Sequence, residues 1–228
     1  MGASTPPLLG RQACFEREVL IIGSGGHAAV VADALLAAGA TILGFTSADA
    51  GDQGNMICGL PILGGDGILD RFRHADLFLV NGIGGIDGMP TRRVVQERLA
   101  EQGWQFTGVR HPSAVVSPFA IVGAGAQFFA QCAVQVGAVI GEGSIINTAA
   151  VVEHHVHIGA FVHIAPRAVL CGEVNIGTGS HIGAGAVIRQ GLRLGEHVIV
   201  GAGAVVVKDF AGPGTLVGVP ASPLESTQ

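Results

Sequence analysis

The chain has 228 residues and a net charge of −5, and its few lysines and arginines form no basic run, which argues against nucleic acid as the main partner. Hydrophobic residues make up 49% of the chain. No apolar run approaches the ~18 residues of a membrane-spanning helix, so no membrane partner is expected. The four cysteines are far apart and form no CxxC pair, which is typical of a reduced, cytoplasmic protein.

Residues 1–18, MGASTPPLLGRQACFERE, lack a basic segment followed by an apolar one, so they predict a flexible lead-in and no signal peptide. Residues 19–108 then alternate strand-like and helix-like segments. We expect strands in VLIIG, ATILGF and ADLFLVNGIG, and helices in GHAAVVADALLAAG and MPTRRVVQERLAEQGW. This β-α-β order predicts a small parallel sheet with right-handed crossovers, that is, a Rossmann-like α/β domain.

A glycine-rich segment, GSGGHA, follows the first predicted strand and opens the first helix. Backbone N–H groups in such a loop, together with a helix N-terminus, suit a phosphate group. The spacing Gly23-x-Gly25-Gly26 is not the GxGxxG of dinucleotide sites, so a redox cofactor is not expected. The alternative is that these glycines only form a tight turn.

From Val116 the period changes to six. An aliphatic residue or phenylalanine stands at all sixteen positions spaced by six residues from Val116 to Val206, and every third one is followed by glycine. This eighteen-residue repeat predicts a β-solenoid over residues 109–228, a left-handed parallel β-helix with three hexads per coil and coils ~4.8 Å apart. We expect the recurrent glycines at corners that need positive φ: Gly123, Gly141, Gly159, Gly177 and Gly195.

The hexapeptide phase also locates a histidine-rich segment, NTAAVVEHHVHIGAFVHIAP. His154 comes two residues after an inward position, near a corner, and Gly172 one coil further leaves that space without a side chain. His163 and His181 fall one above the other on one face. Histidine titrates near neutrality, so the cluster could serve a metal, a general base or neither.

A three-histidine zinc site, as in the gamma class of carbonic anhydrases, is one alternative. No third ligand stands at the phase of His163 and His181, so no metal is predicted. The other alternative is that these histidines are solvated side chains on coil faces, an interpretation that suits His157, His181 and His197.

Several segments together resemble a known family: VLIIGSGGHAAVVAD, GLPILGG, HPSAVVSP, NTAAVVEH, GAFVHIAPRAVLCGEVNIG and LVGVPAS. In this order, from Val19 to Ser222, they are similar to the sugar O- and N-acyltransferases of the sialic-acid, bacillosamine and perosamine pathways of polysaccharide biosynthesis. The resemblance implies an acetyltransferase that uses acetyl-CoA as co-substrate and acts on an amino or hydroxyl group of a sugar, usually a nucleotide-sugar.

The resemblance also implies residue roles. His154 is at the position of the general base, a task that suits an imidazole with a pKa near the working pH. His163 matches a histidine that lines the acetyl-CoA site. Gly172 matches a glycine whose backbone N–H holds the thioester carbonyl, the usual electrostatic aid in acyl transfer.

For the sugar and nucleotide, the resemblance implies contacts to a nucleotide-sugar from Gly25, Gly26 and His27 of the first domain. Asn147 and Glu153 match positions that line the sugar pocket of the β-helix domain. This class of solenoid usually covers its flat faces by forming a homotrimer, so we expect active sites between subunits.

Three positions depart from the family pattern. An acidic residue usually follows the catalytic histidine and orients it, whereas here that place is taken by His155, so Glu153, a water or a neighbouring subunit would have to substitute. The second strand ends in Thr46 and Ser47 where acidic residues commonly face the nucleotide. Ser222 follows GVPA where a cation usually contacts coenzyme A.

The sequence therefore predicts an N-acetyltransferase in which the amine of a nucleotide-linked amino sugar attacks acetyl-CoA directly, with His154 as base and no acyl-enzyme. O-Acetylation of a free sugar such as sialic acid remains one alternative. A nucleotide-sugar-binding homologue that has lost catalysis, because of His155, is the other.

Overall fold

The structure, a computed structural model, describes residues 17–85 and 91–224. Most of the predicted lead-in, residues 1–16, lies outside the described residues. The chain forms two compact units, which we describe separately: residues 17–84 and 91–112 make the first, and Gly85 and residues 113–224 make the second. In the part of the chain that is described, no helix is long and apolar enough to cross a membrane.

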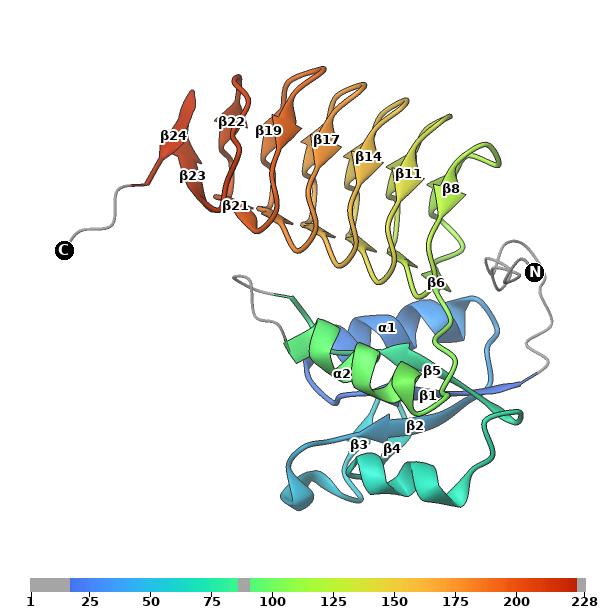
Figure 1. The fold of residues 1–228 in the computed structure, drawn as a ribbon. Coiled ribbons are helices and arrows are strands. Elements are labelled where there is room, and N and C mark those ends of the chain that lie inside the picture. The colour runs from blue at the N-terminus through green and yellow to red at the C-terminus, as the bar shows by residue number, and fades with distance from the viewer. Residues whose placement is uncertain (1–16, 86–90, 225–228) are drawn as a thin grey trace. The chain divides into compact units, whose positions relative to one another are not determined.

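The first unit contains a five-stranded sheet with the order β3-β4-β2-β1-β5 (Figure 1). Strands β2, β1 and β5 are parallel, as the β-α-β pattern predicts. Strand β4, which was not predicted, is parallel to β2, while the short edge strand β3 runs antiparallel to β4. The elements are β1 Glu18–Ile22, α1 Gly26–Ala37, β2 Ile42–Thr46, η1 Ala50–Asp52, β3 Met56–Ile57, β4 Leu60–Gly64, η2 Asp66–Arg71, β5 Leu77–Asn81, α2 Thr91–Glu101 and β6 Val109–Arg110.

Helix α1 is rich in alanine and leucine and packs on β1 and β2. It ends because Gly39 takes a φ of 80° just after the last turn and donates its N–H to the carbonyl oxygen of Leu36 (3.0 Å). Gly82, after β5, lets helix and sheet approach closely, since a Cβ there would lie 2.9 Å from the Cβ of Ala28. This close packing fixes the position of the glycine-rich loop, GSGGHA, that follows β1.

Helix α2 is tied to β5 by a buried arginine. Arg92 donates to the carbonyl oxygens of Asn81 (3.2 Å) and Ile83 (2.8 Å), and the Asn81 amide donates to the Arg92 carbonyl oxygen (2.9 Å). Burial lowers the pKa of Arg92 to about 9, so the guanidinium is still charged at neutral pH and needs these carbonyl partners. The network fixes the end of β5 beside the glycine loop.

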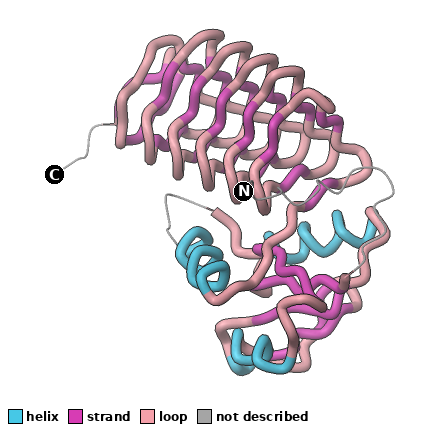
Figure 2. The backbone as a smooth tube through the Cα atoms, turned by 45° about the vertical axis from the view of Figure 1, so that its right-hand side comes forward, coloured by secondary structure: helices cyan, strands magenta, loops and turns pink. Residues whose placement is uncertain are grey.

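The second unit is the predicted left-handed parallel β-helix, in which short strands and turns repeat from coil to coil (Figure 2). From residue 115 to residue 206 each strand pairs in parallel with the strand eighteen residues away, and three stacked sheets form the three faces. At the C-terminal end of the third sheet, the last two strands pair antiparallel. One sheet has β7 Val115–Val116, β10 Ala133–Val134, β13 Val151–Val152, β16 Val169–Leu170, β19 Val187–Ile188 and β22 Val205–Val206. The next has β8 Ile121–Val122, β11 Val139–Ile140, β14 His157–Ile158, β17 Asn175–Ile176 and β20 Arg193–Leu194. The third contains β9 Gln127–Phe128, β12 Ile145–Ile146, β15 His163–Ile164, β18 His181–Ile182, β21 Val198–Val200, β23 Gly214–Gly218 and β24 Ala221–Pro223.

The inward-pointing side chains form the core of the β-helix. All sixteen residues at the six-residue spacing are buried, from Val116 and Val122 (8% exposed each) to side chains such as Ile146 and Leu170 that are fully covered. Register makes them stack: Val152 pairs with Val134 on one side and with Leu170 on the other. Burying aliphatic side chains at about 25 cal/mol per Å² of apolar area is the main stabilising term for such a column.

The expected role of the recurrent glycines was wrong. None of the five has a φ in the left-handed region, and instead they allow close approach of the next coil: a Cβ on Gly141 would lie 2.4 Å from the backbone of Gly159. The left-handed corners come three residues after each inward position from Val122 to Val200. Glycine holds many of them, including Gly137 and Gly191, but His155 and His197 hold others.

Candidate active site

His154 lies at the turn that follows β13, two residues after buried Val152, and its ring is half-buried. The ring extends along the stack over Gly172 of the next coil. A Cβ on Gly172 would lie 2.4 Å from His154 Cε1 and 2.6 Å from Nε2, so only glycine leaves room for this ring. The structure therefore brings together the two residues that the hexapeptide phase placed one coil apart.

His155 contacts the His154 ring at its Nδ1 atom. The two Nδ1 atoms are 3.2 Å apart, and the rings meet edge to face with centroids 5.4 Å apart. His155 itself is a left-handed corner residue with φ of 56°, and its ring leans on the preceding coil, where a Cβ on Gly137 would lie 2.6 Å from His155 Cδ2. The rings of His154 and His155 thus lean in opposite directions along the stack.

Two further polar residues flank this corner. Glu153 is half-buried, and its carboxylate forms no hydrogen bond with the ring of His154 or with another side chain within residues 17–85 and 91–224. His157, exposed, has its Nδ1 3.1 Å from the carbonyl oxygen of His155 and donates to it. Of the two candidate orienting residues, only His155 contacts the His154 ring in this structure.

His163 is held differently, with a partner at each ring nitrogen. Asn147 Oδ1 accepts the Thr148 N–H (2.7 Å), so the Asn147 amide nitrogen is the group that faces His163 Nε2 (3.1 Å). Nε2 then accepts, and Nδ1 carries the proton that is donated to the carbonyl oxygen of Gly85 (2.7 Å). The network assigns His163 as a neutral ring whose two nitrogens are both engaged, so it suits a wall of the site and not a base.

His163 pairs in register with His181, as the phase predicted, and the two rings meet edge to face with centroids 4.9 Å apart. Among the described residues, no group of three or more His, Cys, Asp or Glu side chains is arranged to hold a metal ion.

Gly172 contributes a second feature besides its missing side chain. The residue is buried, and within the described part of the chain its N–H has no hydrogen-bond acceptor. The N–H groups at the same turn phase of other hexads, such as Ala160 and Ala184, likewise have no acceptor in the described part of the chain. What distinguishes Gly172 is that its N–H belongs to the residue over which the His154 ring extends, so it is a candidate donor to a ligand acceptor.

The first unit has a second candidate site, at the carboxyl ends of its parallel strands, where ligands of such sheets bind. Gly25 is the N-cap of α1 and has no side chain to cap the first-turn N–H groups. Nothing lies within 4 Å of where a Cβ would be on Gly25 or Gly26, and both are exposed. His27 follows in the first turn of the helix. Open backbone donors at a helix N-terminus suit a phosphate.

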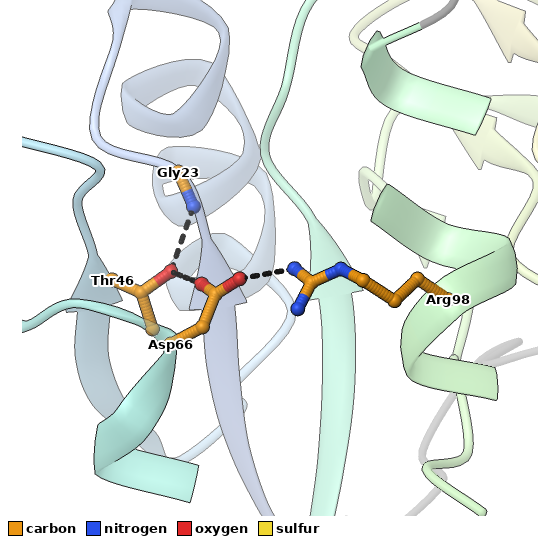
Figure 3. Close-up of polar contacts among 4 residues, drawn as sticks. All are labelled: Gly23, Thr46, Asp66 and Arg98. Carbon is orange, nitrogen blue, oxygen red and sulfur yellow. Dashed lines mark hydrogen bonds and ion pairs between the residues drawn. The ribbon is translucent and has the colours of Figure 1, made fainter. Parts of the chain in front are cut away.

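The end of β2 carries charge that the sequence motif did not reveal. Thr46 accepts the Gly23 N–H (3.2 Å) and donates to Asp66 Oδ1 (3.2 Å), while Asp66 also forms an ion pair with Arg98 of α2 (Figure 3). Ser47 donates to Asp52 Oδ2 (2.6 Å). The two hydroxyl residues that replace the expected acids are thus each bonded to a carboxylate.

Asp52, Asp66 and Arg98 are residues of this site that sequence analysis missed. Asp66 directly follows β4, and an acidic residue just after a parallel strand is a signal that could have found it. Arg98 lies 32 residues away from Asp66 and had no such signal. At the other end of the chain, Ser222 lies in β24 opposite Val217.

Comparisons with known proteins identify the family of the chain. The family model described as PglD N-terminal domain matches residues 18–99. No match was found among curated proteins.

Among solved structures, the acetyltransferase domain of PglB from Neisseria gonorrhoeae, in complex with acetyl coenzyme A, is 38% identical, with a TM-score of 0.86; the match covers 92% of this chain and 100% of that one. A variant of perosamine N-acetyltransferase from Caulobacter crescentus, in complex with CoA and GDP-perosamine, is 36% identical with a TM-score of 0.86, covering 92% and 97%. WeeI from Acinetobacter baumannii shares the fold at 24% identity and a TM-score of 0.77, covering 91% and 100%. The chain belongs to the hexapeptide-repeat sugar acetyltransferases.

Proposed function

We propose that this enzyme transfers the acetyl group of acetyl-CoA to the amine of a nucleotide-linked amino sugar, with His154 as general base. One observation carries the proposal. The His154 ring extends over Gly172, held at Nδ1 by His155, and its Nε2 makes no hydrogen bond within the described residues. A half-buried imidazole with one nitrogen held and one open is the arrangement that a general base needs.

The chemical step needs no covalent enzyme intermediate. The sugar amine attacks the thioester carbonyl carbon and passes its proton to His154 Nε2. The C–S bond then breaks, and the coenzyme A thiolate takes up the proton from the imidazolium. During attack, the Gly172 N–H donates to the oxyanion; one donor of this kind contributes about 10²–10³-fold to turnover.

Charge and loop geometry support a nucleotide-sugar as the acceptor. The open N–H groups at Gly25 and Gly26 suit a diphosphate, with His27 beside them, and Ser47 and Asp52 supply hydroxyl and carboxylate groups for a ribose. In the solved relative from Caulobacter crescentus the acceptor is GDP-perosamine. On the β-helix, Asn147 and Glu153 would line the sugar pocket and His163 the acetyl-CoA site.

The enzyme is proposed to work as a homotrimer with active sites between subunits. Large apolar side chains are exposed on the first coils of the β-helix, including Val115 (66%), Phe119 (74%) and Ile121 (68%). They lie on two neighbouring faces, in β7 and β8, and in the turn between them, and burying them in a subunit contact would remove apolar surface from water. The open His154 corner would then be completed by a neighbouring copy.

A thioester-consumption assay tests the reaction. Steady release of free CoA with an amino-sugar nucleotide, such as GDP-perosamine, is the expected result. Release only with a free sugar would replace the proposal by O-acetylation, and release with neither would indicate a binding protein without catalysis.

Replacing His154 by asparagine should lower turnover by about 10²–10⁴-fold, the typical contribution of a general base. Binding of CoA, measured by calorimetry, should change little, because the ring acts on the proton and not on the coenzyme. Near-normal turnover of this variant would contradict the assignment of His154.

A further inference from the structure

The rings of His154 and His155 are joined by one hydrogen bond. Their Nδ1 atoms are 3.2 Å apart, a hydrogen-bonding distance, and two lone pairs cannot bond to each other. One Nδ1 must therefore donate and the other accept. The choice decides which nitrogen of His154 is basic, because a neutral imidazole carries its single proton on only one nitrogen.

We infer that His155 is the positioning residue of the base: its Nδ1 accepts the Nδ1–H of His154, which leaves the lone pair of His154 on Nε2. The inference rests on the proposed function, since it is this tautomer that can accept the proton of an amine. In the opposite arrangement Nε2 of His154 would already carry the proton and could not act as base. His155 thus supplies a neutral acceptor for the Nδ1–H of His154.

The backbone holds the His155 ring firmly enough for this role. Histidine is one of the residue types that tolerate the left-handed region, in which His155 lies with φ of 56°. Its N–H donates to the carbonyl oxygen of Val136 (3.1 Å), and its carbonyl oxygen accepts from His157 Nδ1 (3.1 Å). The ring then rests on the open face of Gly137.

No full negative charge bonds to either ring in the described part of the chain. The titratable groups at this corner are those beside His154 on its own turn and those that flank Gly172 on the next coil: Glu153, His155, His157, Cys171 and Glu173. On the preceding coil Gln135, Val136 and Gly137 carry no charge. Neither glutamate forms a side-chain hydrogen bond.

Two substitutions at His155 change its ring while keeping the left-handed backbone conformation of this corner. Glycine occupies the equivalent corner at Gly137 and Gly191, with φ of 72° and 75°, so His155→Gly keeps a conformation that this solenoid already uses. Aspartate also tolerates this region, so His155→Asp restores an acceptor and adds a negative charge. His197 is a matched control, since it has φ of 54° and leans on Gly179.

The test is kcat and KM over a range of pH for the wild type and the three variants. His155→Gly should lower kcat by about 10- to 100-fold with KM within about twofold, because the base loses its orientation and not its substrate. His155→Asp should recover most of kcat and move the acid limb of kcat/KM to higher pH by about one unit, because a carboxylate stabilises the imidazolium. His197→Gly should match the wild type.

A second measurement tests the inference without relying on turnover. Nitrogen-15 NMR of the imidazoles should show the proton of neutral His154 on Nδ1, and the His154 titration should move to higher pH in His155→Asp. A wild type that is inert with every amino-sugar nucleotide would overturn the proposed function, while NMR would still report on the pair. A His154 proton on Nε2, or a His155→Gly enzyme with wild-type kcat and pH profile, would overturn the inference.

Discussion

His154 and His163 differ in the partners of their ring nitrogens. His163 has Asn147 at one nitrogen and the Gly85 carbonyl at the other, so its protonation state is fixed by neighbours. His154 has a partner only at Nδ1 within the described residues. The two residues are of the same type and differ in their partners. The histidine-rich segment by itself therefore does not distinguish a general base from a residue that lines the site.

Replacing Gly172 by alanine should disable His154 without unfolding the chain. The new Cβ would lie 2.4 Å from His154 Cε1, so the ring must leave its place, and turnover should fall by about 10²-fold, as expected for a displaced catalytic group. Thermal melting and a kcat measurement on the same preparation check this.

The control for Gly172→Ala is already present in the sequence. Alanine stands at the same phase on other coils, at Ala130, Ala160, Ala184 and Ala202, so the backbone accepts it there. The free energy of unfolding should therefore change by no more than about 0.5 kcal/mol. Full activity would mean that the ring does not need this space, and a large loss of stability would mean that the backbone does not accept alanine at this turn.

At the scale of elements, the carboxyl end of β2 depends on a buried hydroxyl. Thr46 is 1% exposed, accepts the Gly23 N–H and donates to Asp66, so it links the glycine loop to the start of η2. Arg98 extends the link to α2 (Figure 3). The exposed ion pair adds little by itself, since surface pairs are worth roughly 0–1 kcal/mol.

Thr46→Val should lower the stability of the first unit by about 1–2 kcal/mol, because the Gly23 N–H loses its acceptor while the shape of the side chain is kept. Thr46→Ser, which retains the hydroxyl, is the control. The single tryptophan, Trp104, is buried in this unit, so its fluorescence in a urea titration reports on it. Equal midpoints for the two variants would show that the hydroxyl does not matter.

The principal elements of the first unit could be predicted from the sequence, since β1, β2, β5 and α1 have clear buried or alanine-rich patterns. Strands β3 and β4 and the η1 and η2 turns were not predicted, because glycine, proline and aspartate interrupt the apolar residues of this segment. For the site, the six-residue phase was sufficient to place His154 over Gly172. It could not place the Gly85 carbonyl at His163, because 78 residues separate them and no repeat relates them.

At the scale of the whole molecule, the family and the β-helix were predictable because the repeat is long, whereas assembly rests on surface residues that no period reveals. Light scattering should give a mass three times that of the chain. Ile121→Glu, on an exposed apolar position of β8, should shift the mass toward that of one chain and lower activity, since a charge would have to be buried in the contact. Met56→Glu, also exposed and apolar but in the first unit, should leave the mass unchanged; a monomeric wild type would contradict the trimer.

Each hexad has one residue at the turn position of His154, two residues after the inward position. Between Pro118 and Ala202, the one glycine at this position is Gly172. A ring placed at any other such turn would meet a β-carbon eighteen residues later and be pushed outward. Relocating the chemistry along the column would therefore take two coordinated exchanges a full coil apart, a histidine and a glycine. A search for new enzymes among hexapeptide sequences can use that spaced pair as a filter, since the pair reports directly on the room that an imidazole needs.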